Sequence, residues 1–255
     1  MKVREMDIEI YRHYSNALEA GRNSGWRIDE MKSCGAKFNS KFCAGKYDKQ
    51  HGKFRDYEKE SEEIMSLLAL GPHNTVMDMG CGTGAFVIHA APYFKKVYAV
   101  DISQAMLKCA RKKARKAGLQ NVEFCQGGFL TYRHCSEPVD AIVSTNALHH
   151  LPDFWKLVAL RKLGYMLRTG GKLYLFDVVY SFDVVDYESC FKGFIESMVN
   201  LAGPEMKNPL DSHLSREYST FGWIIEDMLE KAGFEIDKID YKNGFFGAYL
   251  CTKKA

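Results

Sequence analysis

The chain has 255 residues, of which 46% are hydrophobic, 26% are charged and six are proline, and its 35 basic and 32 acidic residues leave a formal net charge of +3. At roughly 100–200 residues per domain, this length indicates one large domain, or one domain with an appendage. A charge so close to neutral argues against nucleic acid or an anionic membrane as a partner. We expect neither a membrane span, which needs about 18 consecutive apolar residues, nor a secretory signal at residues 1–15.

Eight cysteines are spread along the chain without any C-x-x-C pair. They stand at positions 34, 43, 81, 109, 125, 135, 190 and 251. Structural zinc sites are usually built from closely spaced ligand pairs, so this spacing argues against a metal site. Free thiols of this kind are typical of reducing compartments. We therefore expect buried apolar cysteines, a cytoplasmic protein and no bound metal.

Residues 1–58 are the least regular part of the sequence. Apolar residues at near-helical spacing predict a helix over residues 6–18, and glycines then interrupt the pattern. From Glu58 a short helical pattern runs to the stop signal at Gly71-Pro72. The chain thus divides into a helical N-terminal extension, residues 1–58, and a main domain, residues 59–255.

After Pro72, short β-rich runs alternate with helical patterns. The predicted strands are Thr75–Met79, Lys96–Val100, Val122–Cys125, Val139–Ser144, Lys172–Val179, Phe234–Ile239 and Gly247–Cys251. The predicted helices are Ala85–Phe94, Ser103–Ala117, Phe154–Leu167 and Tyr218–Lys231. Strands joined by helices of this length pair in parallel and carry helices on both faces. The pattern therefore predicts an α/β, Rossmann-like, doubly wound fold with a mostly parallel, seven-stranded sheet.

Two segments depart from this alternation. Only residues 240–246 separate the last two predicted strands, so these strands should form an antiparallel C-terminal hairpin. Residues 180–217 are too long for a plain connection and predict an inserted helical cap. Ligands of open parallel sheets bind beyond the carboxyl ends of the strands, near the point where strand order reverses. The functional residues should therefore follow the central strands.

Residues 78–84 (DMGCGTG) join the first predicted strand to a helix. The three glycines allow a left-handed backbone and close approach of a ligand, but they also satisfy the dinucleotide pattern G-x-G-x-x-G/A. Asp78 separates the two interpretations. At about 4 Å and an effective dielectric near 20, a carboxylate repels a pyrophosphate charge by about 4 kcal/mol and attracts a cation equally. Asp78 thus favours a cationic ligand, unless it only caps the turn by accepting from nearby amides.

Asp101 ends the second predicted strand, about 20 residues past the glycine turn. A carboxylate at this position is placed to accept both hydroxyls of a ribose. Ser103 is expected to cap the following helix at its N-terminus. The alternative is that Asp101 only helps to cap that helix.

Together these motifs resemble the class I S-adenosylmethionine-dependent methyltransferases from about Glu58 to the C-terminus. Residues 78–84 resemble the family's first motif, and residues 100–103 resemble its second. Residues 141–151 resemble the fourth-strand segment of members that methylate small metabolites, quinone precursors among them. The turns at residues 167–173 and 232–234 resemble those before the fifth and sixth strands. Residues 44–48 (AGKYD) resemble an A-x-x-Y-D segment whose tyrosine lies against the methionine part of the cofactor.

The resemblance implies S-adenosylmethionine as the cofactor and S-adenosylhomocysteine as the product. It implies that Asp78 and the turn hold the methionyl end, that Asp101 holds the ribose, and that Ile102 covers one face of the adenine. The other implied cofactor contacts are Gly80, Cys81, Gly82, Gly84, Gly128, Phe129, Asn146, Leu148 and Tyr47. Residues 1–58 are expected to form a lid across the cofactor.

The sequence departs from the family pattern at Gly128, where many members have an acid that accepts from the adenine amino group. Loss of this charge-assisted hydrogen bond would cost about 1–3 kcal/mol, unless a backbone carbonyl or Gln126 replaces it. Phe129 remains available to stack on the adenine.

Methyl transfer from a sulfonium is an in-line displacement that needs alignment and exclusion of water, and it needs a base only if the acceptor must lose a proton. His149 and His150 follow the fourth predicted strand, and Tyr47 lies at the implied mouth of the cofactor site. These three residues are the catalytic candidates, although each also fits a structural role. The candidate polar contacts in the cap are Glu188, Glu196, Glu205, Arg216 and Glu217.

We expect the acceptor to be a small molecule. The fourth-strand segment lacks the Asn/Asp-Pro-Pro-aromatic loop of many DNA and protein N-methyltransferases, and the basic residues of segment 108–116 oppose an apolar stripe, so they indicate a solvated helix face and no nucleic acid. Two other functions stay open, a binding or scaffold protein without turnover and a nicotinamide-dependent dehydrogenase. The sequence assigns neither the acceptor atom nor the oligomeric state.

Overall fold

The computed structural model describes residues 25–32, 48 and 50–255. The strands are β1 (Thr75–Met79), β2 (Lys96–Asp101), β3 (Val122–Gln126), β4 (Val139–Thr145), β5 (Leu167–Tyr180), β6 (Thr220–Phe221), β7 (Phe234–Lys242) and β8 (Phe246–Lys253). The α-helices are α3 (Tyr57–Leu68), α4 (Ala85–Ala90), α5 (Gln104–Lys116), α6 (Asp153–Met166), α7 (Tyr187–Ala202), α8 (Lys207–Arg216) and α9 (Gly222–Lys231). Single 3-10 turns are η1 (Ala91–Tyr93), η2 (Leu148–His150), η3 (Val184–Asp186) and η4 (Pro204–Met206).

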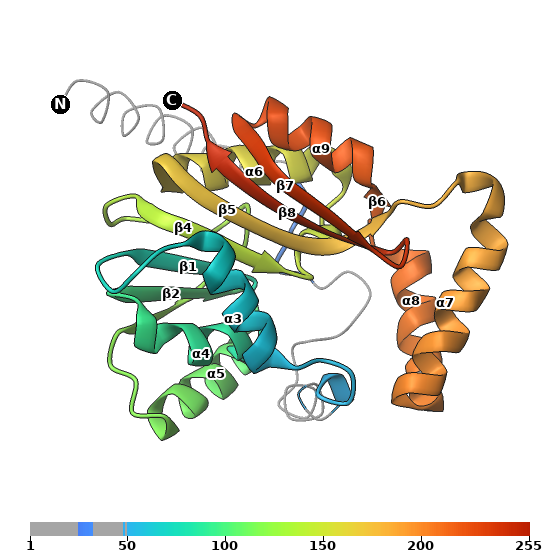
Figure 1. Cartoon of the computed structure of the whole chain (residues 1–255), viewed down its shortest axis with the longest axis horizontal. Helices are drawn as coiled ribbons and strands as arrows, with labels where there is room; N and C mark the ends of the chain where they lie inside the picture. The colour runs from blue at the N-terminus through green and yellow to red at the C-terminus, as the bar shows by residue number, and fades with distance from the viewer. Residues whose placement is uncertain (1–24, 33–47, 49) are drawn as a thin grey trace.

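The strands form one twisted sheet in the order β3-β2-β1-β4-β5-β8-β7, with β6 paired to β5 off this path. Strands β1 to β5 pair in parallel, and β8 pairs antiparallel with both β5 and β7. Helices α3, α4 and α5 lie on one face of the sheet and α6 and α9 on the other (Figure 1). The predicted doubly wound fold and its C-terminal hairpin are confirmed.

Successive side chains of a strand point to opposite faces of the sheet, so each strand contributes to a core on both faces. Val97 and Ala99 of β2 pack with α3 and α4, whereas Tyr98 and Val100 pack with α6 and α9. Because both faces are covered, every residue from Val97 to Asp101 is buried. The carboxyl end of β2 is thereby fixed from both sides, and so is the residue that ends it.

The segment before α9 differs from the prediction of one helix over Tyr218–Lys231. Thr220 and Phe221 form the short strand β6, which pairs in parallel with Val179 and Tyr180, and the helix begins only at Gly222. This pairing depends on β5 being long, which local sequence does not reveal. The sheet therefore contains an eighth, two-residue strand that the sequence analysis missed.

Residues 180–217 form the expected helical insertion. Helices α7 and α8 pack against each other and project from the end of the sheet where β5 and the β7–β8 turn lie (Figure 1). Phe194 of α7 stacks on Phe245 of that turn with 4.2 Å between ring centroids. Lys53 donates to the Ala202 carbonyl at 2.7 Å and pairs with Glu205 at 2.8 Å, so the segment before α3 contacts the cap.

The helix predicted over residues 6–18 and the candidate Tyr47 lie outside the described residues. The division at residue 58 and the lid role of residues 1–58 therefore stay predictions. Among the helices that the structure describes, none combines the length and apolar character needed to cross a membrane.

Candidate active site

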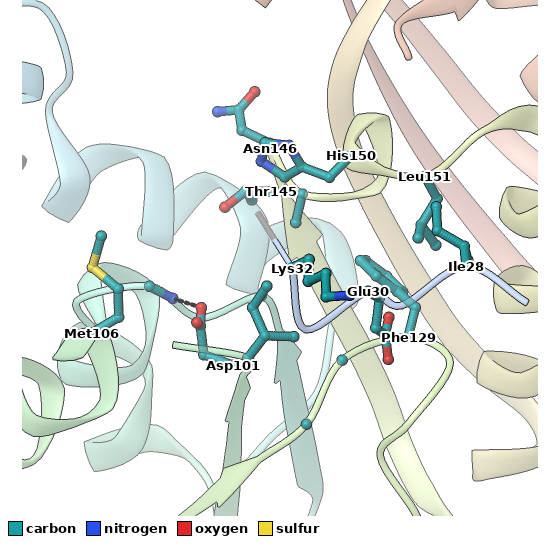
Figure 2. A pocket seen from close by; sticks show the side chains of 16 residues that line it. Ile28, Glu30, Lys32, Asp101, Met106, Phe129, Thr145, Asn146, His150 and Leu151 are labelled. Carbon is teal, nitrogen blue, oxygen red and sulfur yellow. Dashed lines mark hydrogen bonds between the residues drawn. The ribbon is translucent and has the colours of Figure 1, made fainter. Parts of the chain in front are cut away.

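A pocket opens at the carboxyl ends of β1, β2 and β4, where strand order reverses on either side of β1 (Figure 2). This is the place where ligands of open α/β sheets bind. Of the residues proposed from the sequence, those that line the pocket are Gly80, Gly82, Asp101, Ile102, Gly128, Phe129, Asn146 and His150. The pocket thus brings together residues from four separate sequence motifs.

The glycine turn is shaped by contacts that leave no room for side chains. Gly80 has a φ of 80°, and a Cβ there would lie 2.5 Å from the Ala147 Cβ. Gly84 also has a φ of 80°, and a Cβ there would lie 2.9 Å from the Ala110 Cβ of α5. The amides of Gly80 and Cys81 both donate to the Val100 carbonyl, which holds the turn against the end of β2. The first glycine therefore lets the turn meet the loop after β4, and the third packs α4 on α5.

Asp101 ties the ends of two strands together. Its Oδ2 accepts from the Gly82 amide at 2.8 Å and its Oδ1 accepts from the Ser103 amide at 2.7 Å. Burial raises the pKa of Asp101, and these two amide hydrogen bonds oppose that shift. Ser103 caps α5 as predicted, because its Oγ accepts from the Met106 amide. Asp101 thus combines a role at the helix start with a carboxylate that lines the pocket.

Asp78 lies behind the glycine turn, and its side chain is almost fully buried (2% exposed). Burial, and after it the nearby charge of Asp101, raise its pKa from 3.8 to about 8, although the charge of Arg55 acts in the opposite direction. A buried carboxylate beside a second carboxylate favours a cation that can be placed close to both. Asp78 does not line the pocket itself, so its influence on a ligand there is electrostatic.

Asn146 follows β4, and both its backbone conformation and its side-chain environment are typical of a functional position. Its φ of 53° places a non-glycine residue in the left-handed region. Its side-chain Oδ1 is buried and accepts no hydrogen bond from any described residue. A buried acceptor of this kind is costly unless a donor reaches it. Because Asn146 lines the pocket, a ligand with N–H or O–H groups would meet that need.

Several proposed residues lie near the pocket without lining it. Cys81, Leu148 and His149 are buried. The Leu148 amide donates to Asp177 Oδ2, and Gly84 faces α5 instead of the pocket. These residues support the geometry of the site through the backbone.

Glu30 is a lining residue that the sequence analysis missed. It lies in the segment 25–32, its side chain is buried, and its carboxylate accepts from the amides of Leu130 and Thr131, about a hundred residues along the chain. A Cβ added at Gly128 would lie 2.7 Å from Glu30 Oε2. The unusual glycine at position 128 was the only sequence signal that another group must fill this space.

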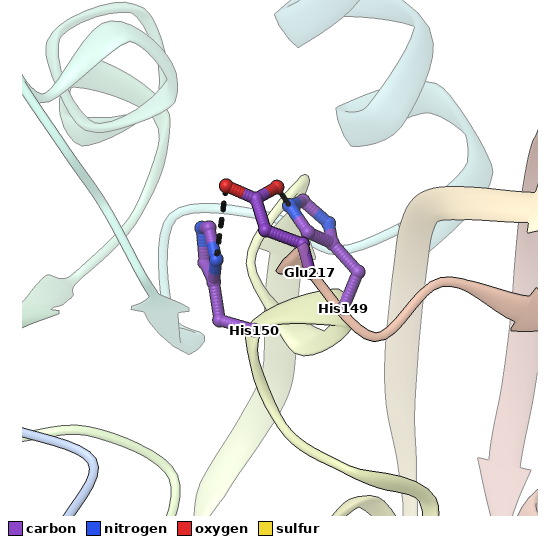
Figure 3. A group of neighbouring side chains, drawn as sticks. All are labelled: His149, His150 and Glu217. Carbon is purple, nitrogen blue, oxygen red and sulfur yellow. Dashed lines mark ion pairs between the residues drawn. The ribbon is translucent and has the colours of Figure 1, made fainter. Parts of the chain in front are cut away.

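A second set of polar residues, buried or partly buried, borders the pocket at its His150 side. His149 Nδ1 donates to Asp177, and His149 Nε2 lies 3.3 Å from Glu217 Oε2. His150 Nδ1 lies 3.9 Å from Glu217 Oε1, so the Glu217 carboxylate is placed between the two imidazoles (Figure 3). His213 of the cap also donates to Glu217, and its other ring nitrogen contacts Ser219 at 3.2 Å. We call residues His149, His150, Asp177, His213 and Glu217 the histidine–carboxylate cluster.

The cap delivers Glu217 to this cluster through backbone contacts. The Tyr218 amide donates to the His149 carbonyl at 2.8 Å, and Lys156 donates to the Tyr218 carbonyl. Of the cap residues considered from the sequence, Glu188, Glu196 and Arg216 are exposed and Glu205 pairs with Lys53. Glu217 is the one that contacts His150, which lines the pocket.

The two neighbouring histidines of the cluster have pKa values shifted in opposite directions, so one is charged and the other is neutral. Burial alone would lower the pKa of His149, but Asp177 and Glu217 outweigh it and raise that pKa to about 9. Burial and the charge of His149 lower the pKa of His150 to about 4. Although burial raises the pKa of the Glu217 carboxyl, hydrogen bonds from His149 and His213 bring it well below its usual range. His150, the member that lines the pocket, is therefore a neutral imidazole at pH 7.

Ligand atoms of His149, His150 and Glu217 all lie within 4.8 Å of one another, a spacing compatible with a divalent cation. The same atoms are also arranged for proton sharing, since Glu217 accepts from His213 and faces His149. The sequence analysis, which looked for cysteine pairs, did not foresee this donor set.

Known proteins are similar to this chain in sequence and in fold. The family described as a methyltransferase domain matches residues 76–171. An uncharacterized methyltransferase of Anoxybacillus flavithermus is 30% identical over 188 residues, covering 72% of this chain and 80% of that protein. Among solved structures, an S-adenosylmethionine-dependent methyltransferase from Clostridium acetobutylicum has a TM-score of 0.64 at 16% identity, covering 83% of this chain and 98% of the other. Magnesium protoporphyrin IX methyltransferase from Synechocystis, solved with bound S-adenosylhomocysteine, has a TM-score of 0.60 at 17% identity, covering 85% and 96%.

The fold and the pocket at the reversal of strand order define a class I, Rossmann-like transferase architecture. The chain belongs to the S-adenosylmethionine-dependent methyltransferase family. Its cofactor is therefore S-adenosylmethionine, and the nicotinamide-dependent and non-catalytic alternatives are not favoured. The buried Asn146 acceptor and the Asp101 carboxylate in the pocket fit such a cofactor, which carries an ammonium and two ribose hydroxyls.

Proposed function

We propose that the protein methylates a small-molecule acceptor, and that the acceptor binds on the His150 side of the pocket. The observation that carries this proposal is the neutral His150 imidazole, which lines the pocket and is backed by the Glu217 carboxylate. The absence of an Asn/Asp-Pro-Pro-aromatic loop after β4 and the near-neutral charge of the chain support a small acceptor over DNA or protein.

In this proposal Asp101 accepts the ribose hydroxyls with the lone pairs left free by Gly82 and Ser103. Asn146 Oδ1 accepts from the methionyl end, and the Asp78 and Asp101 charges favour the cationic ligand. When bound, S-adenosylmethionine supplies a methyl group already activated on a sulfonium. The protein therefore has to align the acceptor, exclude water and accept the proton that the acceptor loses.

We assign that proton to His150. Its Nδ1 side lies toward Glu217, so when Nε2 accepts a proton the carboxylate partly offsets the burial and the His149 charge, which disfavour the imidazolium. Asp177 holds the neighbouring turn η2 through the amides of Leu148 and His149, and it also accepts from His149 Nδ1. His149 is a positioning residue in this scheme, because it is buried and fixes Glu217. The cysteines of the described residues are free thiols, which supports a location in the reducing cytoplasm.

The test is transfer of an isotope-labelled methyl group to a pool of metabolites, with mass spectrometry on the products. We expect labelled small molecules, and we expect His150→Asn to lower kcat by about a hundredfold or more, as for loss of a general base. His73→Asn, an exposed histidine at the opposite end of the sheet, is the matched control. Cofactor binding without labelled product from any acceptor would contradict the proposed activity.

A further inference from the structure

We propose that Glu30 binds the amino group of the cofactor's adenine, in place of the acid that the chain lacks at position 128. The inference rests on the adenosyl cofactor occupying the pocket described above. It assigns a binding role to the segment before the main domain, which no family motif covers.

The position of the Glu30 carboxylate is the first argument. A Cβ at Gly128 would lie 2.7 Å from Glu30 Oε2 and 2.8 Å from its Cδ. Glu30 thus occupies the volume that a side chain at position 128 would fill. It lines the pocket with Ile102, Gly128 and Phe129, the residues implied in holding the adenine, and Figure 2 shows it beside Phe129.

The second argument is the orientation of the carboxylate. Oε1 accepts from the Thr131 amide at 2.5 Å and from the Leu130 amide at 2.9 Å, whereas Oε2 accepts a longer bond, from the Leu130 amide at 3.0 Å. A carboxylate offers about four acceptor positions, so Oε2, the oxygen nearest Gly128, retains capacity for a further donor. An amino group of the ligand supplies that donor.

The third argument is the cost of burying the charge. Glu30 is 8% exposed, and burial raises its pKa, against hydrogen bonds from Thr131 and Leu130 and the charge of Lys162. Lys162 also donates to the Leu130 carbonyl, so a buried cation supports the same loop. A buried acid that gains a ligand donor is better compensated than one that serves only to hold a loop. Exposed polar side chains would hold that loop at lower cost.

The experiment measures the coupling between Glu30 and the adenine amino group. Calorimetry compares S-adenosylhomocysteine with its 6-deamino analogue, in which purine replaces adenine, for the wild type, Glu30→Gln and Glu30→Ala. We expect the wild type to bind the adenine ligand about tenfold more tightly or better, as for a charge-assisted hydrogen bond. We expect Glu30→Ala to bind both ligands equally and Glu30→Gln, which keeps an oxygen for the loop amides, to be intermediate. Asp29→Asn, an exposed neighbouring acid, is the control and should keep the wild-type preference.

A reciprocal variant moves the acid to the position used by the family. Glu30→Ala combined with Gly128→Asp should recover a preference for adenine, after Ile102 Cγ2, which would lie 2.7 Å from the new Cβ, has shifted. Equal preference in the wild type and Glu30→Ala, with only the melting temperature lowered, would overturn the inference and leave Glu30 as a structural contact. Failure of the wild type to bind S-adenosylhomocysteine at all is a different result, because it would refute the cofactor assignment itself.

Discussion

Asp78 gives the sharpest test of how this pocket recognises a cation, because its charge opposes folding and is needed only when the ligand is bound. In the free protein, burial beside Asp101 raises the pKa of Asp78 from 3.8 to about 8. A group whose pKa is higher in the folded state contributes full stability below its unfolded pKa and loses it as pH rises to the folded value. Asp78 therefore destabilises the free protein progressively between about pH 4 and pH 8. Asp78→Asn removes the ionisation and should remove this loss.

The size of the effect follows from the pKa difference of about four units. At about 1.4 kcal/mol per unit, the upper bound is about 6 kcal/mol above pH 8. Since asparagine also replaces whatever hydrogen bonds the carboxyl makes, we expect a net gain of about 2–4 kcal/mol at pH 8.5. For a chain of this length, that gain corresponds to a melting temperature higher by roughly 5–10 °C. At pH 5 the gain should be much smaller.

Cofactor binding should change in the opposite direction. Binding of a cation favours the ionised carboxylate, so the wild type should release a proton near pH 7 and bind S-adenosylmethionine more tightly as pH rises toward 8. Asp78→Asn should release no such proton and bind at least about tenfold more weakly. Calorimetry in two buffers of different ionisation enthalpy measures both quantities. Asp211→Asn, an exposed acid on α8, is the control.

Two results would refute this reasoning. The first is a stability gain for Asp78→Asn that is the same at pH 5 and pH 8.5, because the gain would then not come from ionisation. The second is wild-type cofactor affinity in Asp78→Asn, because the carboxylate would then contribute nothing to recognition of the cation.

The remaining predictions concern the other carboxylates and the histidines. Asp101→Ala should weaken cofactor binding tenfold or more, about 1.4 kcal/mol, because the ribose acceptor is lost; unchanged affinity by calorimetry would exclude that role. Glu217→Gln should lower kcat and destabilise the protein by about 3 kcal/mol, because it removes a buried negative charge that pairs with the charged His149; a normal melting curve would contradict the assigned cluster. Treatment with a chelator should leave turnover unchanged, since Glu217 already accepts from His213; lost activity that Zn²⁺ or Mn²⁺ restores would instead make His149, His150 and Glu217 a metal site.

The framework of the pocket could be predicted from sequence because its determinants are local. Short β-rich runs between helical patterns located the strands, and the three closely spaced glycines identified the turn after β1. The acid at position 101 stands about 20 residues past that turn, as a ribose-binding acid does. In the structure β1 spans Thr75–Met79, as predicted, and Ser103 caps α5. Each of these features depends on residues within a few positions of one another.

The contacts of Glu30 and Glu217 could not be predicted from sequence, because their partners are distant along the chain. Glu30 meets the Leu130 amide from a hundred residues away, and Glu217 reaches His149 from the far end of the cap. The strand β6, which precedes α9 and follows Glu217, forms only because β5 extends to Tyr180. No periodicity or motif in those segments marks a contact of this kind.

The contrast between local and distant contacts also separates the groups supplied by the sheet from those supplied by the appended segments. The turn and the strand ends supply the groups that we propose hold the ribose and the methionyl end, and these come from the sheet itself. Two further acids come from appended segments: Glu30, which lines the pocket, from the segment before α3, and Glu217, which lies beside the lining residue His150, from the end of the cap. Lys53, which also precedes α3, joins the cap at Ala202 and Glu205. Because residues 50–56 and the cap are connected in this way, loss of the Lys53 contacts should loosen the cap and lower kcat in the labelled-methyl assay, although Lys53 does not contact Glu217.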